Sequence, residues 1–129
     1  MQDRPTASEL AEAVREFLKT SILPELQDPR TRFRTLVAMN ALGILERELV
    51  QEEPLLRVEH ERLARLLGRE QATPISLEEL EERVTDLNRV LAERIRSGVV
   101  PEGTFGLLKQ TVEDKLKVAS PRYLERYDR

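Results

Sequence analysis

The sequence predicts an all-α protein, built as a compact antiparallel bundle of about five helices. Apolar residues recur three and four positions apart through most of the chain, and no segment alternates apolar and polar residues as a strand does. Each periodic segment also begins or ends at a capping residue, a proline or a glycine. With 129 residues the chain has the usual size of one domain, so we expect a single helical domain over residues 1–129.

Capping residues and prolines delimit the first two helices. Thr6 and Glu9 form a capping box that opens the first helix, which Pro24 stops or bends. Asp28 caps the second helix, and a proline follows it at the first helical position, where the missing N–H costs nothing. We expect this second helix over residues 29–52 and place it at the centre of the bundle.

Three more helices follow the same logic. A proline opens a third predicted helix over residues 54–68, and a polar linker occupies residues 69–75. Ser76 and Glu79 form a second capping box, which opens a fourth helix over residues 77–98. The apolar stripe of this fourth helix comprises Leu77, Leu80, Val84, Leu87, Asn88, Leu91 and Ile95.

The fifth predicted helix ends before Pro121, because the residue that precedes a proline disfavours the helical conformation. We expect its buried face to comprise Phe105, Leu108, Val112, Leu116 and Ala119. The remaining segment, residues 122–129, is either folded over the bundle or a frayed tail, and we favour folding for Tyr123 and Leu124.

The two asparagines of the chain, Asn40 and Asn88, both fall within apolar stripes. A buried side-chain amide without hydrogen-bond partners costs roughly 1 to 3 kcal/mol. Arg47 shares a helical face with Asn40, and Glu48 lies at its edge. One interpretation is a hydrogen-bond network between helices, closed by Asn88 and a carboxylate of the fourth predicted helix; the other is a ligand pocket. The four residues are the candidate site in both cases.

No pattern in the sequence indicates catalysis or metal binding. The chain lacks cysteine, and it has neither a glycine-rich phosphate loop nor a Gly-x-Ser-x-Gly nucleophile turn. Its one histidine, His60, lies between Glu59 and Glu61, and residue 57 is arginine, which excludes the Glu-x-x-His pairs of a di-iron bundle. We expect His60 on the surface. We therefore predict no enzymatic activity, no catalytic residue, no metal site and no cofactor.

Charge and hydropathy bound the location and the partners of the protein. The net charge is −3, so the overall field opposes nucleic-acid binding. The chain has no apolar stretch near the roughly 18 residues that a membrane span needs. Its polar start lacks the apolar core of a signal peptide. We expect a cytoplasmic protein that binds neither nucleic acid nor membrane. The acidic run from Glu78 to Glu82 is expected to be a solvated helix start.

Three stretches of the chain resemble a known family. They are Arg4-Pro5-Thr6 with Glu9-Leu10, then Phe33-x-x-x-Val37-Ala38-x-Asn40-Ala41-Leu42-x-Ile44 with Arg47-Glu48-Leu49, and finally Lys115-Leu116-x-Val118-Ala119-x-Pro121-x-Tyr123-Leu124. The chain is similar to a small all-helical bacterial family of unknown function. The genes of that family often lie beside an aminoglycoside-phosphotransferase-like kinase and an acyl-CoA dehydrogenase. The resemblance implies a role beside acyl-CoA catabolism and assigns no catalytic residue.

Composition and resemblance together favour a non-catalytic accessory or protein-interaction module. Such a module would form a homo-oligomer, or would bind the kinase-like phosphotransferase or the dehydrogenase. The alternative is a helical carrier or sensor, in which a leucine-lined cavity holds an acyl chain and Arg47 meets a carboxylate or phosphate group.

Overall fold

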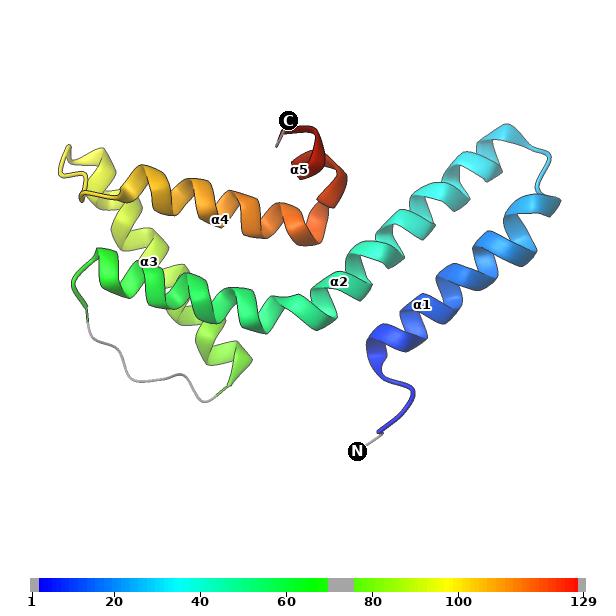
Figure 1. Cartoon of the computed structure of the whole chain (residues 1–129), viewed down its shortest axis with the longest axis horizontal. Coiled ribbons are helices and arrows are strands. Elements are labelled where there is room, and N and C mark those ends of the chain that lie inside the picture. Colours follow the sequence, from blue (N-terminus) through cyan, green and yellow to red (C-terminus); the bar gives the residue numbers. More distant parts are fainter. Residues whose placement is uncertain (1–2, 70–75, 128–129) are drawn as a thin grey trace. The chain divides into compact units, whose positions relative to one another are not determined.

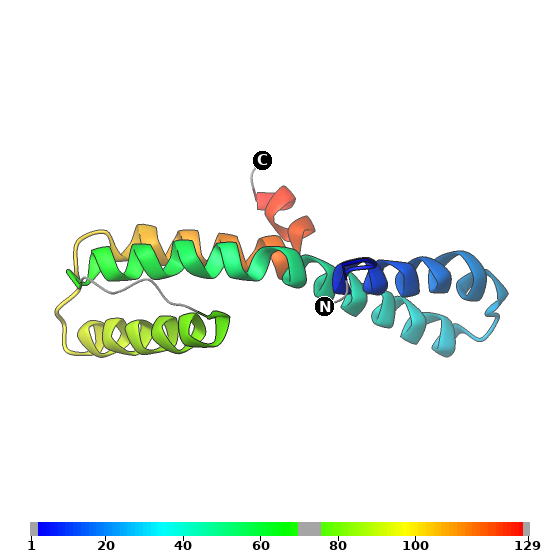
Figure 2. The same cartoon turned by 90° about the horizontal axis from the view of Figure 1, so that it is seen from below.

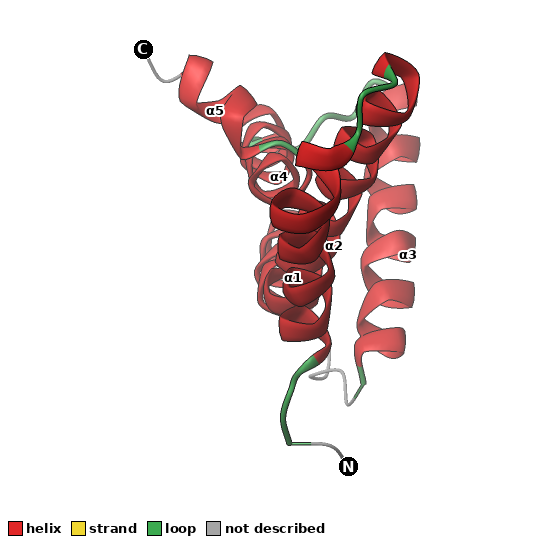
Figure 3. Cartoon of the chain, turned by 90° about the vertical axis from the view of Figure 1, so that its right-hand side faces the viewer, coloured by secondary structure: helices red, strands yellow, loops and turns green. Residues whose placement is uncertain are grey.

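In the computed structural model, which describes residues 3–69 and 76–127, every regular element is a helix (Figure 3). The α-helices are α1 (Ala7–Phe17), α2 (Pro29–Leu66), α3 (Leu77–Arg96), α4 (Thr104–Ala119) and α5 (Pro121–Tyr127). A π-helical turn and a 3-10 turn continue α1 over Leu18–Ile22 and Leu23–Glu25. The predicted all-α class is therefore confirmed. The predicted linker over residues 69–75 lies, except for Arg69, outside the described residues.

The chain divides into two compact units. We call Met1–Glu52 with Val118–Ser120 the hairpin unit, and Glu53–Lys117 with Pro121–Arg129 the core unit. The expectation of one domain over residues 1–129 stays a prediction beside this division.

In the hairpin unit, α1 runs antiparallel to the first half of α2 (Figure 1). The predicted capping box is confirmed, because Thr6 Oγ1 accepts from the Glu9 amide at 3.2 Å while the Thr6 amide donates to Glu9 Oε1 at 3.3 Å. The predicted cap of the second helix is also present. Asp28 Oδ2 accepts from the amide and the hydroxyl of Thr31 at 3.1 and 2.7 Å, and α2 begins at Pro29. Local capping thus fixes where both helices begin.

The predicted break between the second and third helices is wrong, because α2 continues without interruption from Pro29 to Leu66 with Pro54 inside it. A proline in a helix removes the hydrogen bond to the carbonyl four residues earlier, here that of Val50, and costs about 3 kcal/mol. Two glutamates precede Pro54 and two leucines follow it, and these residues have high helix propensity. The boundary between the two units nevertheless falls between Glu52 and Glu53, next to this proline.

The core unit packs the second half of α2 against α3 and α4 (Figures 1 and 2). Its buried apolar cluster consists of Leu63, Leu67, Leu80, Val84, Leu87, Leu91 and Leu107. The periodicity of the fourth predicted helix is confirmed, since four of these residues repeat along α3 at helical spacing.

Two glycines end the helices of the core unit. Gly68 and Gly98 adopt positive φ angles of 65° and 83°, which other residues rarely tolerate. After Gly68 the Arg69 amide donates to the Ala64 carbonyl at 2.8 Å, and after Gly98 the Val99 amide donates to the Arg94 carbonyl at 3.0 Å. Both ends therefore satisfy carbonyls that the helix leaves unpaired, as predicted for Gly68.

The predicted buried face of the fifth helix is wrong. Phe105, Leu108 and Val112 on α4 are exposed, and Phe105 has 83% of its surface in solvent. The buried face instead carries Thr104, Leu107 and Asp114. Periodicity of apolar residues misses this face because two of its three buried members are polar.

After Ser120 the chain forms the short helix α5, which Pro121 opens at a position that tolerates proline. Leu124 is half-buried and Tyr123 is exposed. The predicted packing of this segment over the bundle stays a prediction.

Candidate protein-interaction surface

The predicted site residues of the hairpin unit do not face its interior. Asn40 and Glu48 are exposed, so the expectation that they point to a core is wrong. The side of α2 that faces α1 is a different one, where Glu46 meets α1. Glu46 follows Asn40 by six residues, which turns it away by about a third of a helical turn.

The half-buried side chain of Arg47 makes a hydrogen bond within the protein. Its Nε donates to the carbonyl of Val118 at 2.7 Å, near the end of α4. The last four carbonyls of a helix have no partner within the helix, so a guanidinium there satisfies one of them. The side chain also lies over Gly43, where an added Cβ would meet the guanidinium at 3.4 Å. Any ligand for Arg47 would have to share it with Val118.

Asn88 belongs to a polar network in the core unit. Its Nδ2 donates to Glu59 Oε1 at 3.3 Å, which matches the interpretation of a network between helices. The carboxylate comes from α2, whereas the prediction placed it on the helix of Asn88 itself. Glu59 and the adjacent His60 are both buried, so the expectation of a surface histidine is wrong. The continuous α2 turns these two residues toward its neighbours together with Leu63. Asn40 and Asn88 lie in different units.

Asp114 is the centre of a second polar network, which sequence reasoning missed. The buried carboxylate accepts from Arg62 Nη1 at 2.7 Å, from Lys117 Nζ at 3.0 Å and from Gln110 Nε2 at 3.1 Å. Burial by itself raises the pKa of the Asp114 carboxyl, but the hydrogen bonds from Arg62, Lys117 and Gln110 together outweigh burial and lower it. The carboxylate is thus held ionised and joins α2 to α4 within the core unit.

Polar contacts also join the two helices of the hairpin unit. Arg15 Nε donates to Glu46 Oε2 at 2.6 Å and Arg15 Nη2 donates to Glu46 Oε1 at 3.2 Å, a bidentate pair. The hydrogen bond from Arg15 to Glu46 is the main cause that raises the pKa of the guanidinium. The Ser8 hydroxyl donates to the Glu46 carbonyl at 3.2 Å. Polar contacts therefore help to hold the helices of the hairpin unit together, as apolar packing does in the core unit.

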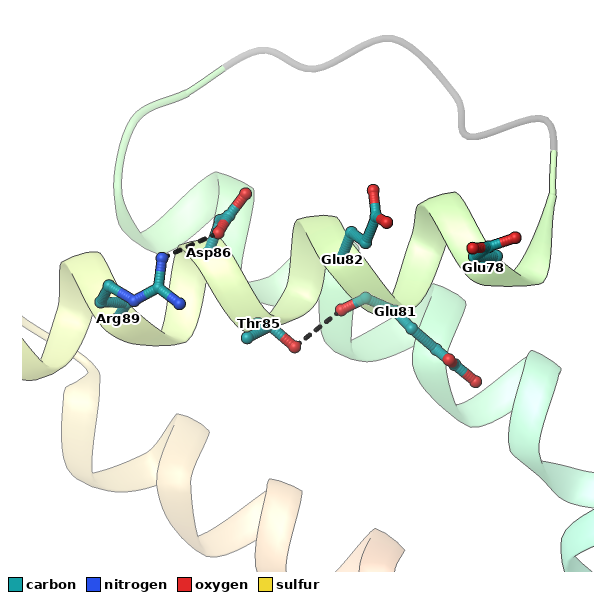
Figure 4. A pocket seen from close by; sticks show the side chains of 6 residues that line it. All are labelled: Glu78, Glu81, Glu82, Thr85, Asp86 and Arg89. Atoms are coloured by element: carbon teal, nitrogen blue, oxygen red, sulfur yellow. Dashed lines mark hydrogen bonds and ion pairs between the residues drawn. The ribbon is translucent and has the colours of Figure 1, made fainter.

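Two surface depressions of the described structure bear on the carrier alternative. One is formed by α3 alone and is lined by Glu78, Glu81, Glu82, Thr85, Asp86 and Arg89 (Figure 4). Its three glutamates are exposed, as expected for a solvated helix start. The other lies between α2 and α4 and includes Arg62, Arg65, Leu66, Glu102 and Gly103. Neither depression is the leucine-lined cavity that the carrier alternative requires. Among the described residues, no group of three or more potential ligands could hold a metal ion.

Three helices expose apolar stripes at helical spacing. Apart from Ala41 and the half-buried Ile44 on α2, their side chains are between 40 and 83% exposed. We call them the α1 stripe (Leu10, Val14 and Phe17), the α2 stripe (Phe33, Leu36 and Val37, continued by Ala41 and Ile44) and the α4 stripe (Phe105, Leu108 and Val112). Single exposed apolar residues are common on monomers, whereas contiguous ones mark interaction sites. These stripes, rather than a pocket, are the strongest candidate for a functional surface.

Residues 24–123 match the model of a family described as a domain of unknown function, DUF6285. The match covers more than half of the chain, which therefore belongs to this family. No curated protein and no solved structure gave a match. In the described part of the chain, no helix has both the length and the apolar character to cross a membrane.

Proposed function

We propose that this DUF6285 protein is a non-catalytic accessory or protein-interaction module. The observation that carries the proposal is the set of three exposed apolar stripes on α1, α2 and α4. Removing apolar surface from water contributes about 25 cal/mol per Å², so each stripe stabilises a complex that covers it. The arrangement fits a protein whose partner contacts are made by helix faces.

We assign the α4 stripe to a partner that is a different protein. It begins with Phe105, which is 83% exposed, and continues through Leu108 and Val112 at spacings of three and four residues. An aromatic side chain at such a position typically anchors an interface by filling a pocket of the partner. A helix with anchors at this spacing fits an apolar groove.

The family resemblance supplies the candidate partners. It implies that the gene lies near an aminoglycoside-phosphotransferase-like kinase and an acyl-CoA dehydrogenase. We propose that the protein binds one of these two enzymes and that it acts beside acyl-CoA catabolism in the cytoplasm. Gene adjacency is an association, so this assignment depends on a binding measurement.

Co-expression with each enzyme tests the proposal directly. We expect one of the two enzymes to co-purify with the tagged protein in a fixed ratio, measured by light scattering after gel filtration. Val112→Glu places a charge in the α4 stripe and should weaken the complex at least about tenfold, since an unpaired charge in an apolar interface is costly to desolvate. Thr85→Glu is the matched control, because it adds the same charge on the exposed side of α3. Failure of both enzymes to bind, or equal loss in both variants, would contradict the proposal.

The alternative, a carrier or sensor of a small acyl or phosphate-bearing ligand, has one supporting observation. Arg65 and the backbone around Gly103 line the depression between α2 and α4, and a phosphate group could meet the guanidinium there. Native mass spectrometry of freshly purified protein would show a retained ligand of fixed mass if this alternative holds, and the bare chain mass would contradict it.

A further inference from the structure

We infer that the α2 stripe of the hairpin unit binds the same stripe of a second copy of the chain, with the two helices antiparallel and Asn40 at the centre. The inference rests on the proposed function and names a partner for one of its surfaces. It follows from the spacing of the stripe, from the position of its polar residue and from the distribution of charge along α2.

The stripe has the spacing of a helix that packs lengthwise on another helix. Phe33, Asn40 and Arg47 follow one another at intervals of seven residues, so they lie along one side of α2. Leu36 and Val37 fill the first interval, while Ala41 and Ile44 fill the second. This side is not used by α1, which contacts α2 at Glu46.

The stripe is complementary to itself when it is reversed. Leu36 and Ile44 each lie four residues from Asn40, so an antiparallel copy places the leucine of one chain on the isoleucine of the other. Phe33 and Arg47 each lie seven residues away, which places the ring against the aliphatic stem of the arginine.

Asn40 itself meets its own copy in this arrangement. A side-chain amide carries both a donor NH₂ and an acceptor carbonyl, so two amides related by a two-fold axis satisfy each other. A single asparagine in an otherwise apolar stripe fixes the register of paired helices, at a cost in stability. The dimer thus gives the exposed amide in the middle of the α2 stripe a hydrogen-bond partner.

Charge decides the direction of pairing. From Pro29 to Leu45 the charged residues of α2 are three arginines, Arg30, Arg32 and Arg34, with no acidic residue. From Glu46 to Glu52 there are three glutamates against one arginine. An antiparallel pair sets the basic part of each helix beside the acidic part of the other, whereas a parallel pair would align like charges. Arg34 and Glu48, fourteen residues apart and both exposed, lie on the same flank of the stripe.

Sedimentation of the purified wild-type chain, with no other protein present, is the first test. We expect a dimer that dissociates on dilution. Val37→Glu should shift the protein to monomer, while Val112→Glu should leave the dimer unchanged. The two valines are matched, with 52 and 56% of their surfaces exposed. Circular dichroism should show unchanged helix content in both variants. A wild-type monomer at all concentrations, or equal effects of the two substitutions, would overturn the inference.

A charge exchange tests the antiparallel register. Arg34→Glu and Glu48→Arg should each weaken the dimer about tenfold, because each variant sets like charges opposite each other twice in the symmetric dimer. The double variant restores opposite charges and should recover most of the wild-type affinity. If the two changes add instead of compensating, the helices do not pair in this direction and the inference fails.

The proposed dimer and the proposed binding to an enzyme can be contradicted independently of each other. Loss of the dimer in Val37→Glu with retained enzyme binding supports the role of the α2 stripe in self-association. A dimer that binds neither enzyme would leave the inference standing while contradicting the proposed partners.

Discussion

The two units of this chain differ in how their helices are held together. In the core unit seven leucine and valine side chains form a buried cluster, and four of them are below 2% exposed. In the hairpin unit the buried side chain is Ala11, among the described residues, and the helices meet through Arg15, Glu46 and Ser8.

This difference supports the inference that a second chain covers part of the hairpin unit. Helices in proteins gain most of their stability from packing an apolar face, and two helices that bury one alanine have little of it. Nevertheless, α1 and α2 carry as many apolar side chains as a buried face requires, and these side chains form the exposed α1 and α2 stripes. Apolar residues for a core are therefore present, but the packing of α1 on the first half of α2 does not bury them.

The largest expected effect comes from truncating a leucine in each unit. Leu87→Ala removes a side chain that is 1% exposed in the core unit and should lower the free energy of unfolding by about 2 to 5 kcal/mol, because it leaves a cavity. Leu36→Ala changes a side chain that is 44% exposed and should cost less than about 1 kcal/mol in the monomer. Urea denaturation at a concentration where the protein is monomeric measures both. Equal losses would show that the hairpin unit has a core of its own.

The substitution Asp114→Asn should have the next largest effect on the free energy of unfolding, and this effect should depend on pH. The variant loses the charge that Arg62 and Lys117 contact, which should cost about 1 to 3 kcal/mol at neutral pH. The pKa of Asp114 lies below its ordinary value of 3.8 in the folded protein, so its contribution is complete above that value and disappears as the pH falls through the folded pKa.

Denaturation of both proteins between pH 7 and pH 2 measures this dependence. The wild type should lose stability more steeply than Asp114→Asn below about pH 4, and the two curves should converge in acid. Parallel curves over the whole range would mean that the charge of Asp114 does not contribute to the free energy of unfolding.

Local signals in the sequence predicted most helix ends, and the continuous helix through Pro54 is the exception. The caps at Thr6, Asp28 and Ser76 and the terminal glycine Gly68 were predictable because they satisfy backbone groups within a few residues. The leucine repeat of α3 was predictable because an apolar core covers it. Pro54 was misjudged because a proline does not by itself end a helix, and α2 continues through it.

The candidate site was harder to predict than the fold. The buried face of α4 was missed because Asp114 gains three donors from residues that periodicity does not connect with it. Asn40 was expected inside because its stripe is apolar, but the helix that would cover this stripe is not α1. Asn88 and Glu59 do meet, whereas the pattern alone could not identify which carboxylate Asn88 would contact. Periodicity therefore predicts that a face is apolar and does not say what covers it.

Replacing each asparagine with leucine sharpens the comparison of the units. Asn88→Leu leaves the buried carboxylate of Glu59 without this donor and should lower the free energy of unfolding by about 1 to 2 kcal/mol at any protein concentration. Asn40→Leu should leave the monomer within about 0.5 kcal/mol of the wild type, since its side chain is exposed. Its effect should instead appear in the size distribution, because the register of the dimer loses its polar contact. A destabilised Asn40→Leu monomer would contradict the assignment of this side of α2 to a second chain.

The helix caps give a last comparison of the two units. Thr6→Ala and Ser76→Ala each remove a side chain that accepts a hydrogen bond from the amide three residues later, at 3.2 and 3.1 Å, and each should cost about 1 kcal/mol. The consequences should differ, because α3 is anchored by four buried residues and α1 by Ala11. Hydrogen exchange should therefore show that Thr6→Ala frees the amides along much of α1 while Ser76→Ala affects the first turn of α3.

Dilution of the wild type to monomer should increase exchange in the first half of α2 as well, if a second copy covers its stripe. Protection of α1 and α2 that equals that of α3 in the diluted protein would mean that the hairpin unit is stable without a partner, and would remove the main argument for its open surface.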